Sequence, residues 1–195
     1  FVCSLVGCIV HFSEGTNWII RGMVRFLIHH SVDGKTVYFS QFYQMNIQAR
    51  KLEALMEIIT GHVKMDVERE GTAPPEGCRY STYVIESQEY STSSLKTLQE
   101  EFEGIQIIYC EVGGIVISLG LHDSDSVILA KSFINSWVYT LKKIYKTTSF
   151  TNIYDRVDEL LAYLDKMLPL GELLITNQSY REYLSNEASA LTRSM

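Results

Sequence analysis

Three groups of residues carry side chains that could do chemistry, and each also has a simpler structural explanation. His29 and His30 could ligate a metal, but they lie in an expected strand, where neighbouring side chains point to opposite faces and cannot chelate one ion together. Cys110 could act as a nucleophile, yet the adjacent Glu111 disfavours its thiolate, and the sequence places no histidine to activate it. We expect a small thiol in the core at this position.

Asp123 and Asp125 could form a pair of carboxylates for acid–base work. The same residues suit the start of a helix, where short polar side chains cap free backbone amides. The sequence contains no glycine-rich phosphate loop and no Ser-His-Asp pattern. We therefore predict a protein that is not an enzyme and that has no catalytic residue, no metal site and no cofactor.

The composition narrows the class of partner. The chain has 195 residues, which suits one domain, and its 17 basic and 23 acidic residues give a net charge of −6. No local basic run could neutralise phosphates, so a nucleic-acid partner is not expected. Hydrophobic residues make up 46% of the chain and aromatic residues 11%, so we expect part of the apolar surface to meet another protein.

The cysteines indicate a reducing compartment. They form no CxxC pair, and none has a histidine at the usual zinc-ligand spacing, so we interpret them as reduced thiols of a cytosolic protein. One disulfide among them is left open. The four are Cys3, Cys8, Cys78 and Cys110.

The strongest structural pattern lies between residues 105 and 171. Two runs rich in β-branched residues, 105–109 and 115–119, flank a Gly-Gly turn and predict a hairpin. Two helices follow, the second of which ends at Pro169 and Gly171. Their apolar residues recur close to every 3.6 positions, first at Val127, Ile134, Val138, Leu141 and Tyr145, then at Ile153, Val157, Leu160, Leu161, Leu164 and Leu168.

The rest of the chain supplies an opening hairpin and a helix. Strands over 24–30 and 36–43 flank Asp33-Gly34, a strong hairpin signal, and an amphipathic helix is expected near 47–64. The further expected segments are an exposed loop over 64–79, a strand over 80–86, a short helix over 91–103, an extended tail over 172–176 and a helix over 180–191. The predicted fold class is α+β: a five-stranded, mainly antiparallel sheet with helices on both faces, in the order of a longin domain.

The first 22 residues need a separate interpretation. Their apolar part, residues 1–12, lacks a basic region and a cleavage site and is too short to span a bilayer, which takes about 20 residues. We predict that residues 1–22 are an extension outside the domain, that the longin domain covers 23–184, and that 185–195 form a tail. An extra strand at the sheet edge is the alternative that the sequence leaves open.

Several motifs resemble the small (sigma) subunits of adaptor protein complexes. The likeness runs from Met23 to about Leu184, and it is most specific in the ending Leu-Pro-Leu-Gly-Glu-Leu-Leu at 168–174. Among those complexes the chain looks most like the sigma subunit of the fifth. The motifs are Met-Val-Arg-Phe-Leu-Ile at 23–28, Gly-Lys-Thr at 34–36, Ile-Ile-Tyr at 107–109, Val-Asp-Glu at 157–159 and Leu-Gly-Glu at 170–172.

This resemblance implies a non-catalytic longin-fold subunit of a heterotetrameric coat complex. Its expected partners are a zeta-type large adaptin and the beta and mu adaptins of the same complex, with spatacsin and spastizin beside them. The implied place is the cytosolic face of late endosomes and lysosomes, where the complex would retrieve cargo towards the Golgi, and membrane association would be indirect. A longin module in a regulator of small GTPases, such as an exchange-factor assembly, is the alternative, since fold does not fix function.

The resemblance also implies candidate residues for a peptide pocket or a subunit interface. Clathrin-linked relatives help hold acidic dileucine signals with a basic residue just after the Gly-Lys-Thr turn, where this chain has Val37. The basic pair after Ile-Ile-Tyr is replaced by Cys110 and Glu111, so the charge that attracts an acidic peptide is missing or reversed. The apolar side of the pocket is kept at Ile115, Val138 and Ile153.

Overall fold

The structure is a computed structural model of the whole chain, in which the described residues fall into two compact units. One unit is Arg25–Asp123, and the other combines Phe1–Val24 with Ser124–Met195. Each unit is described by itself below. The described residues are 9–11, 19–43, 49–71, 79–84, 102, 104–122, 125–145, 157–173, 179–180, 182–183, 186–187 and 190.

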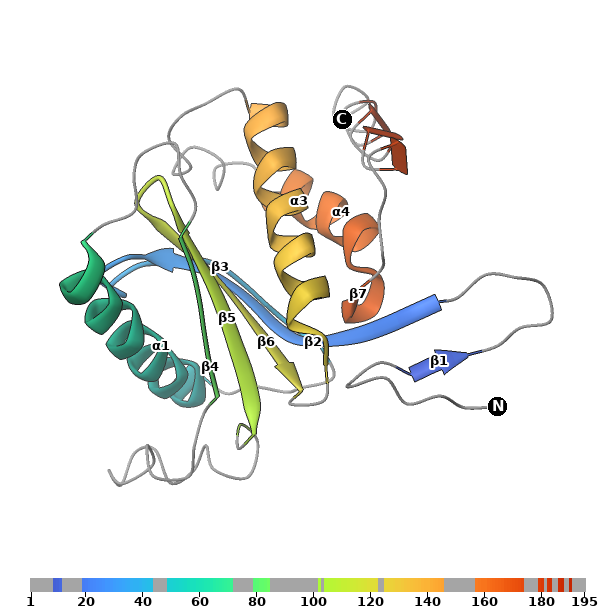
Figure 1. Cartoon of the computed structure of the whole chain (residues 1–195). Coiled ribbons are helices and arrows are strands. Elements are labelled where there is room, and N and C mark those ends of the chain that lie inside the picture. Colours follow the sequence, from blue (N-terminus) through green and yellow to red (C-terminus); the bar gives the residue numbers. More distant parts are fainter. Residues whose placement is uncertain are drawn as a thin grey trace. The chain divides into compact units, whose positions relative to one another are not determined.

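Five strands form the main sheet (Figure 1). The order is β3-β2-β6-β5-β4, and β5 and β6 are joined by the predicted hairpin, in which Val112 lies opposite Ile115 and Gly113 and Gly114 both have positive φ. The pairs β2–β3, β4–β5 and β5–β6 are antiparallel. The strands are β2 (Ile19–Ser31), β3 (Val37–Phe42), β4 (Arg79–Val84), β5 (Ile105–Val112) and β6 (Ile115–His122).

Helix α1 (Ala49–Glu70) packs on this sheet through its apolar side. Leu55, Ile59 and Val63 are fully buried, and they share a core cluster with residues of β2, β5 and β6. The predicted amphipathic helix is confirmed, because its spacing places these side chains on one face. The sheet members of the cluster are Phe26, Ile28, Ile105, Ile107, Tyr109 and Val116.

The prediction of an exposed loop from residue 64 was wrong at its start. The helix continues to Glu70 because Val67 still packs against the core and Asp66 still bonds to the sheet. It ends at Gly71, whose amide donates to the Val67 carbonyl over 2.8 Å and whose φ of +77° suits glycine. Residues 72–78 lie outside the described residues.

A close contact between neighbouring strands fixes the centre of the core. A Cβ atom added at Gly120 of β6 would lie 2.2 Å from a ring carbon of Phe26 in β2, so only glycine leaves room for that ring. Phe26 is fully buried and also meets the rings of Phe42 and Phe102, at centroid distances of 6.0 and 6.3 Å. Phe102 is the described residue of the short helix predicted over 91–103.

The second unit contains the two later helices, α3 (Val127–Tyr145) and α4 (Val157–Met167). Ser126 caps α3, since its side-chain oxygen accepts from the Leu129 amide at 3.5 Å. The helices meet through Trp137, which is fully buried and whose ring lies 6.4 Å from that of Tyr163. Helix α4 ends before Pro169, as predicted, and the chain then forms a 3-10 turn over Pro169–Gly171.

Two short strands extend the first half of β2. Strand β7 (Glu172–Leu173) pairs with Gly22 and Met23, and β1 (Ile9–His11) pairs with residues 19–21. Strand β2 therefore begins at Ile19, earlier than the predicted start at residue 24, and the structure contains the extra strand that the sequence left open. The divisions at residues 22 and 185 stay predictions.

The predicted fold class is confirmed. The described chain has a mostly antiparallel sheet, with the five expected strands, the additions β1 and β7, and the helices α1, α3 and α4. The strand order and the position of α1 between β3 and β4 are those of a longin-like domain.

Candidate functional site

A groove of about 560 Å³ lies beside α1, where the helix passes the turn that joins β2 to β3. Its apolar surface comes from Met56, which is buried, from Leu52, which is half-buried, and from Val37, which is 39% exposed. Charged side chains surround this surface. The remaining lining residues are Asp33, Gly34, Lys35, Glu53, Glu57, Thr60, Gly61 and Lys64.

A network of short-range hydrogen bonds holds the turn in shape. The Asp33 carboxylate accepts from the Ser31 hydroxyl at 2.6 Å and from the Lys35 amide at 3.1 Å, and Ser31 in turn accepts from the Thr36 amide at 3.0 Å. The Ser31 hydrogen bond is the main cause that lowers the pKa of Asp33. The turn is therefore a rigid wall of the groove, in keeping with the Asp-Gly signal.

The turn is also pressed against the helix. Gly34 has a φ of +73°, and a Cβ atom placed there would lie 2.2 Å from the hydroxyl oxygen of Thr60, a buried residue of α1. Both the backbone conformation and the space at this point require glycine. The contact sets the width of the groove, because it fixes the turn on the helix that forms the other wall.

Replacing Gly34 with alanine should lower the free energy of unfolding by about 2 to 3 kcal/mol, from positive-φ strain plus overpacking. The matched variant is Gly34→Ala in a Thr60→Ala background. There the Thr60 hydroxyl and methyl groups are gone and only the Cβ of residue 60, at 2.9 Å, still meets the added methyl group, so the added cost should fall by about 1 kcal/mol. Urea denaturation of the wild type, of the two single variants and of the double variant gives the cost of Gly34→Ala in each background. Equal costs in both backgrounds would show that Thr60 does not confine the turn.

The charges around the groove do not favour an acidic ligand. Three carboxylates, Asp33, Glu53 and Glu57, stand against the two ammonium groups of Lys35 and Lys64. Lys35 is 3.7 Å from Asp33, and both side chains are largely exposed, so this pair contributes little to stability.

The four predicted site residues have different surroundings. Val37 lines the groove, whereas Ile115 is the first residue of β6, is 1% exposed and is not among the lining residues. Val138 lies on α3 in the other unit and is 4% exposed. Ile153 lies outside the described residues. A pocket made by these residues stays a prediction.

An acidic dileucine peptide should bind weakly or not at all to a complex assembled with this chain, because Val37 supplies no positive charge and the adjacent groove is not basic. Isothermal titration of the assembled complex with such a peptide measures this. Val37→Asp is the matched variant, since Val37 is exposed and the change should leave the fold intact. Clear binding by the wild type that Val37→Asp removes would contradict the prediction.

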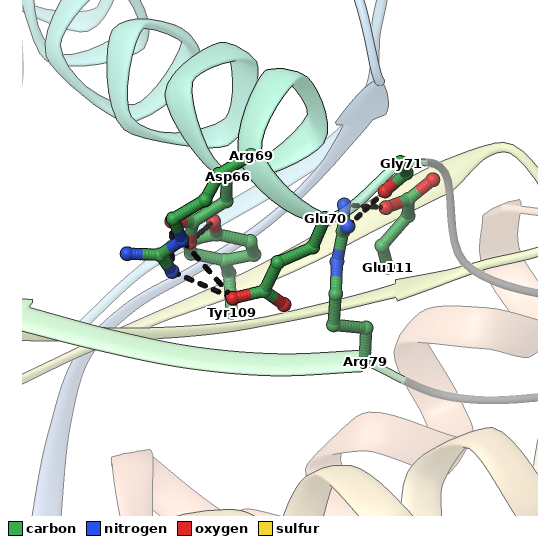
Figure 2. Close-up of polar contacts among 7 residues, drawn as sticks. All are labelled: Asp66, Arg69, Glu70, Gly71, Arg79, Tyr109 and Glu111. Carbon is green, nitrogen blue, oxygen red and sulfur yellow. Dashed lines mark hydrogen bonds and ion pairs between the residues drawn. The ribbon is translucent and has the colours of Figure 1, made fainter.

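A second polar cluster joins the end of α1 to the sheet (Figure 2). The Asp66 carboxylate accepts hydrogen bonds from the Tyr109 hydroxyl and, over 2.9 Å, from the Arg69 guanidinium. Burial and the hydrogen bond to Asp66 raise the pKa of Tyr109. Burial also raises the pKa of Asp66, but hydrogen bonds from Ser81 and Tyr109 outweigh it and lower that pKa overall.

Figure 2 also shows a buried ion pair between strands. Arg79 of β4 lies opposite Glu111 of β5, donates to its carboxylate, and donates as well to the Gly71 carbonyl at the end of α1. The side chains are 14% and 3% exposed. Glu111 therefore neutralises Arg79 inside the fold, so of the two expected alternatives, a missing or a reversed charge, Glu111 does not supply the reversed one. Sequence spacing gave no sign of this pair, because it depends on the register of two strands.

The other candidates for chemistry are core residues. Cys110 is a fully buried thiol, as expected for a small core side chain. Among the described residues there is no group of three or more His, Cys, Asp or Glu side chains that could hold a metal. Asp123 lies outside the described residues, so a pairing with Asp125 stays untested.

His29 and His30 are both fully buried in β2. The ring of His29 lies 5.2 Å from that of Phe39, while His30 donates from Nδ1 to the Ser31 carbonyl at 2.8 Å and accepts from the Ser118 hydroxyl at 3.2 Å. Burial lowers the pKa of His29 to about 3 and that of His30 to about 4. Both rings are therefore neutral and structural at physiological pH.

This burial should make the fold sensitive to mild acid. The folded-state pKa values lie below the ordinary 6.5, so the unfolded chain binds more protons between about pH 6.5 and pH 4, and stability falls as the pH drops through that range. For each histidine, the free energy of unfolding should fall by about 2 kcal/mol between pH 7.5 and pH 5. Urea denaturation at pH 7.5 and at pH 5 tests this, with His30→Gln as the comparison. The stability that this variant loses between the two pH values should be about 2 kcal/mol smaller than the loss of the wild type. An equal loss in both proteins would contradict the role of His30 as a buried neutral ring.

Comparison with known proteins gives a likeness of fold. No known protein family and no curated protein matches the sequence. The structure is similar to a chain of the homology model of the full-length AP-3 complex in a stretched open conformation. That match has a TM-score of 0.58 at 15% identity and covers 88% of this chain and 95% of that chain.

The fold is similar to that of an adaptor-complex subunit. At this low identity the likeness concerns the fold, and it extends over almost the full length of both chains rather than over one motif. None of the helices in the described part of the chain is both long enough and apolar enough to cross a membrane.

Proposed function

We propose that this chain is the non-catalytic small subunit of a heterotetrameric adaptor coat complex that acts in vesicle-mediated protein transport. The observation that carries the proposal is the likeness to a chain of an adaptor complex over 88% of this chain and 95% of the other. Since fold alone does not fix function, the proposal also relies on the sigma-like motifs, above all the ending at residues 168–174.

The finer assignment is to the fifth adaptor complex. Its basis is the sequence resemblance at residues 23–28 and 168–174. On this proposal the partners are a zeta-type large adaptin with its beta and mu adaptins, and spatacsin and spastizin accompany the complex. The chain then works on the cytosolic face of late endosomes and lysosomes, in retrieval towards the Golgi, and reaches the membrane only through the complex.

The role of a subunit predicts dependence on the large adaptin. Obligate interfaces bury more than about 2,000 Å², and a chain that binds only when folded is stabilised by its partner. Co-expression with the zeta-type large adaptin should raise the yield of soluble protein and its melting temperature. A chain that is monomeric, soluble alone and unchanged in melting temperature by the adaptin would contradict the proposal.

The cellular place is tested separately. A tagged chain at its natural level should co-localise with markers of late endosomes and lysosomes, and depletion of the large adaptin should disperse it, because the membrane contact is indirect. Retention on those membranes after the adaptin is removed would contradict indirect association. Localisation to another compartment would leave the subunit role in place and remove the assignment to the fifth complex.

A further inference from the structure

Helix α3 presents an exposed face without charge. Every exposed residue among positions 127–142 of this helix falls on one line, with spacings of four, three and four. Ile128 at one end of the line is 79% exposed and Tyr139 at the other is 54% exposed, while the two residues between them are Ser132 and Asn135. Two large apolar groups thus stand in solvent about three helical turns apart.

The exposed line of α1 in the same chain is the ordinary case. Four of its members are charged, namely Glu53, Glu57, Lys64 and Glu68, and Gly61 lies between them at the same helical spacing, while Met65 is exposed beside the line. A charged line of this kind is well solvated and needs no partner. The contrast shows that the uncharged line of α3 is a local property, and depletion of charge with an aromatic residue present is typical of the centre of a protein interface.

The positive charges beside the α3 line indicate the chemistry of a partner that would bind there. Lys131 and Lys142 each lie three residues after one of the exposed apolar groups, are half-buried, and border the line on the same side. Helix α3 contains no acidic residue along its whole length. A segment that covers the line is therefore favoured if its apolar residues meet Ile128 and Tyr139 and its acidic residues meet the two lysines.

We propose that the exposed line of α3, from Ile128 to Tyr139, is the docking surface for an acidic amphipathic helix of the large adaptin. A helix fits best because the line is straight and about 16 Å long, which a second helix matches with its own i, i+4 row. This inference rests on the proposed function, since it takes the large adaptin as the partner, and it adds the surface through which this chain is held.

The test uses the full chain co-expressed with the zeta-type large adaptin. Ile128→Asp and Tyr139→Asp each place a negative charge at one end of the line, where an apolar side chain should meet the partner, and the amount of adaptin that co-purifies should fall about tenfold or more. Met65→Asp is the matched control: Met65 is 57% exposed on α1, so the same change is made on a solvated helix and should leave co-purification at the wild-type level.

A photo-crosslinking side chain at position 139 gives a second measurement that does not depend on lost binding. It should crosslink to the large adaptin, at a helical segment rich in acidic residues, whereas the same side chain at position 65 should not. Lys131→Glu combined with Lys142→Glu should weaken the complex as well, and the remaining binding should lose much of its dependence on salt.

The possible results distinguish a failure of the proposed docking surface from a failure of the proposed subunit role. If the adaptin co-purifies equally with wild type, Ile128→Asp and Tyr139→Asp, and position 139 gives no crosslink, the α3 surface is wrong and the subunit role stands. If the wild-type chain retains no large adaptin, the proposed function fails and this inference fails with it. A crosslink from position 139 to a different protein would overturn the choice of partner.

Discussion

Replacing Glu111 with alanine should lower the free energy of unfolding by about 3 to 5 kcal/mol, the usual cost of leaving one member of a buried ion pair alone. Arg79 would keep its charge with a side chain only 14% exposed, and it would still donate to the Gly71 carbonyl. Three elements meet at this pair, namely β4, β5 and the end of α1, so the substitution should destabilise the whole Arg25–Asp123 unit.

The matched control removes both charges together. Arg79→Met combined with Glu111→Leu keeps a similar volume without a buried charge, and such replacements are often neutral or stabilising. We therefore expect the double variant to recover most of the stability lost in Glu111→Ala, as measured by urea denaturation. A single variant close to wild type, or a double variant as unstable as the single one, would show that the pair does not hold the strands to the helix.

Replacing Trp137 with alanine should cost about 3 to 5 kcal/mol, the range for a large aromatic residue in a core. Trp137 is fully buried, and its ring lies 6.3 Å from that of Phe133 and 6.4 Å from that of Tyr163. The change would leave a cavity between α3 and α4 that neighbouring side chains cannot fill without moving.

Tyr139→Ala on the same helix is the control for Trp137. It also removes an aromatic ring, but Tyr139 is 54% exposed, so the isolated chain should change by no more than about 0.5 kcal/mol. Thermal and urea denaturation of both variants give the comparison. Similar losses in the two would contradict the assignment of Trp137 to the core and of Tyr139 to the surface.

Local sequence signals predicted much of the fold. The two hairpins were predicted from Asp33-Gly34 and Gly113-Gly114, where the glycines have positive φ. Helix α1 was predicted from the spacing of apolar residues such as Leu55, Ile59 and Val63, which are buried. Features that depend on distant partners were not predictable. Helix α1 runs past residue 64 because Asp66 meets Tyr109, a partner 43 residues away.

The candidate site was predicted less well than the fold. Val37 was named through the resemblance and does line the groove, but the groove itself arises from the contact of Gly34 with Thr60 across the β2–β3 turn and α1. Glu111 was expected to alter surface charge, and only the strand register shows that it faces Arg79. The sequence shows which residues are apolar or charged, whereas the packing of the folded chain decides which of them remain exposed.

The most direct test of the subunit role is affinity purification of the tagged full chain from cells, followed by mass spectrometry of the proteins that stay bound. Our account predicts a large adaptin, a beta adaptin and a mu adaptin in comparable amounts, with spatacsin and spastizin beside them if the complex is the fifth. Recovery of a small GTPase and its regulators, with no adaptin, would contradict the account and would assign the chain to an exchange-factor assembly.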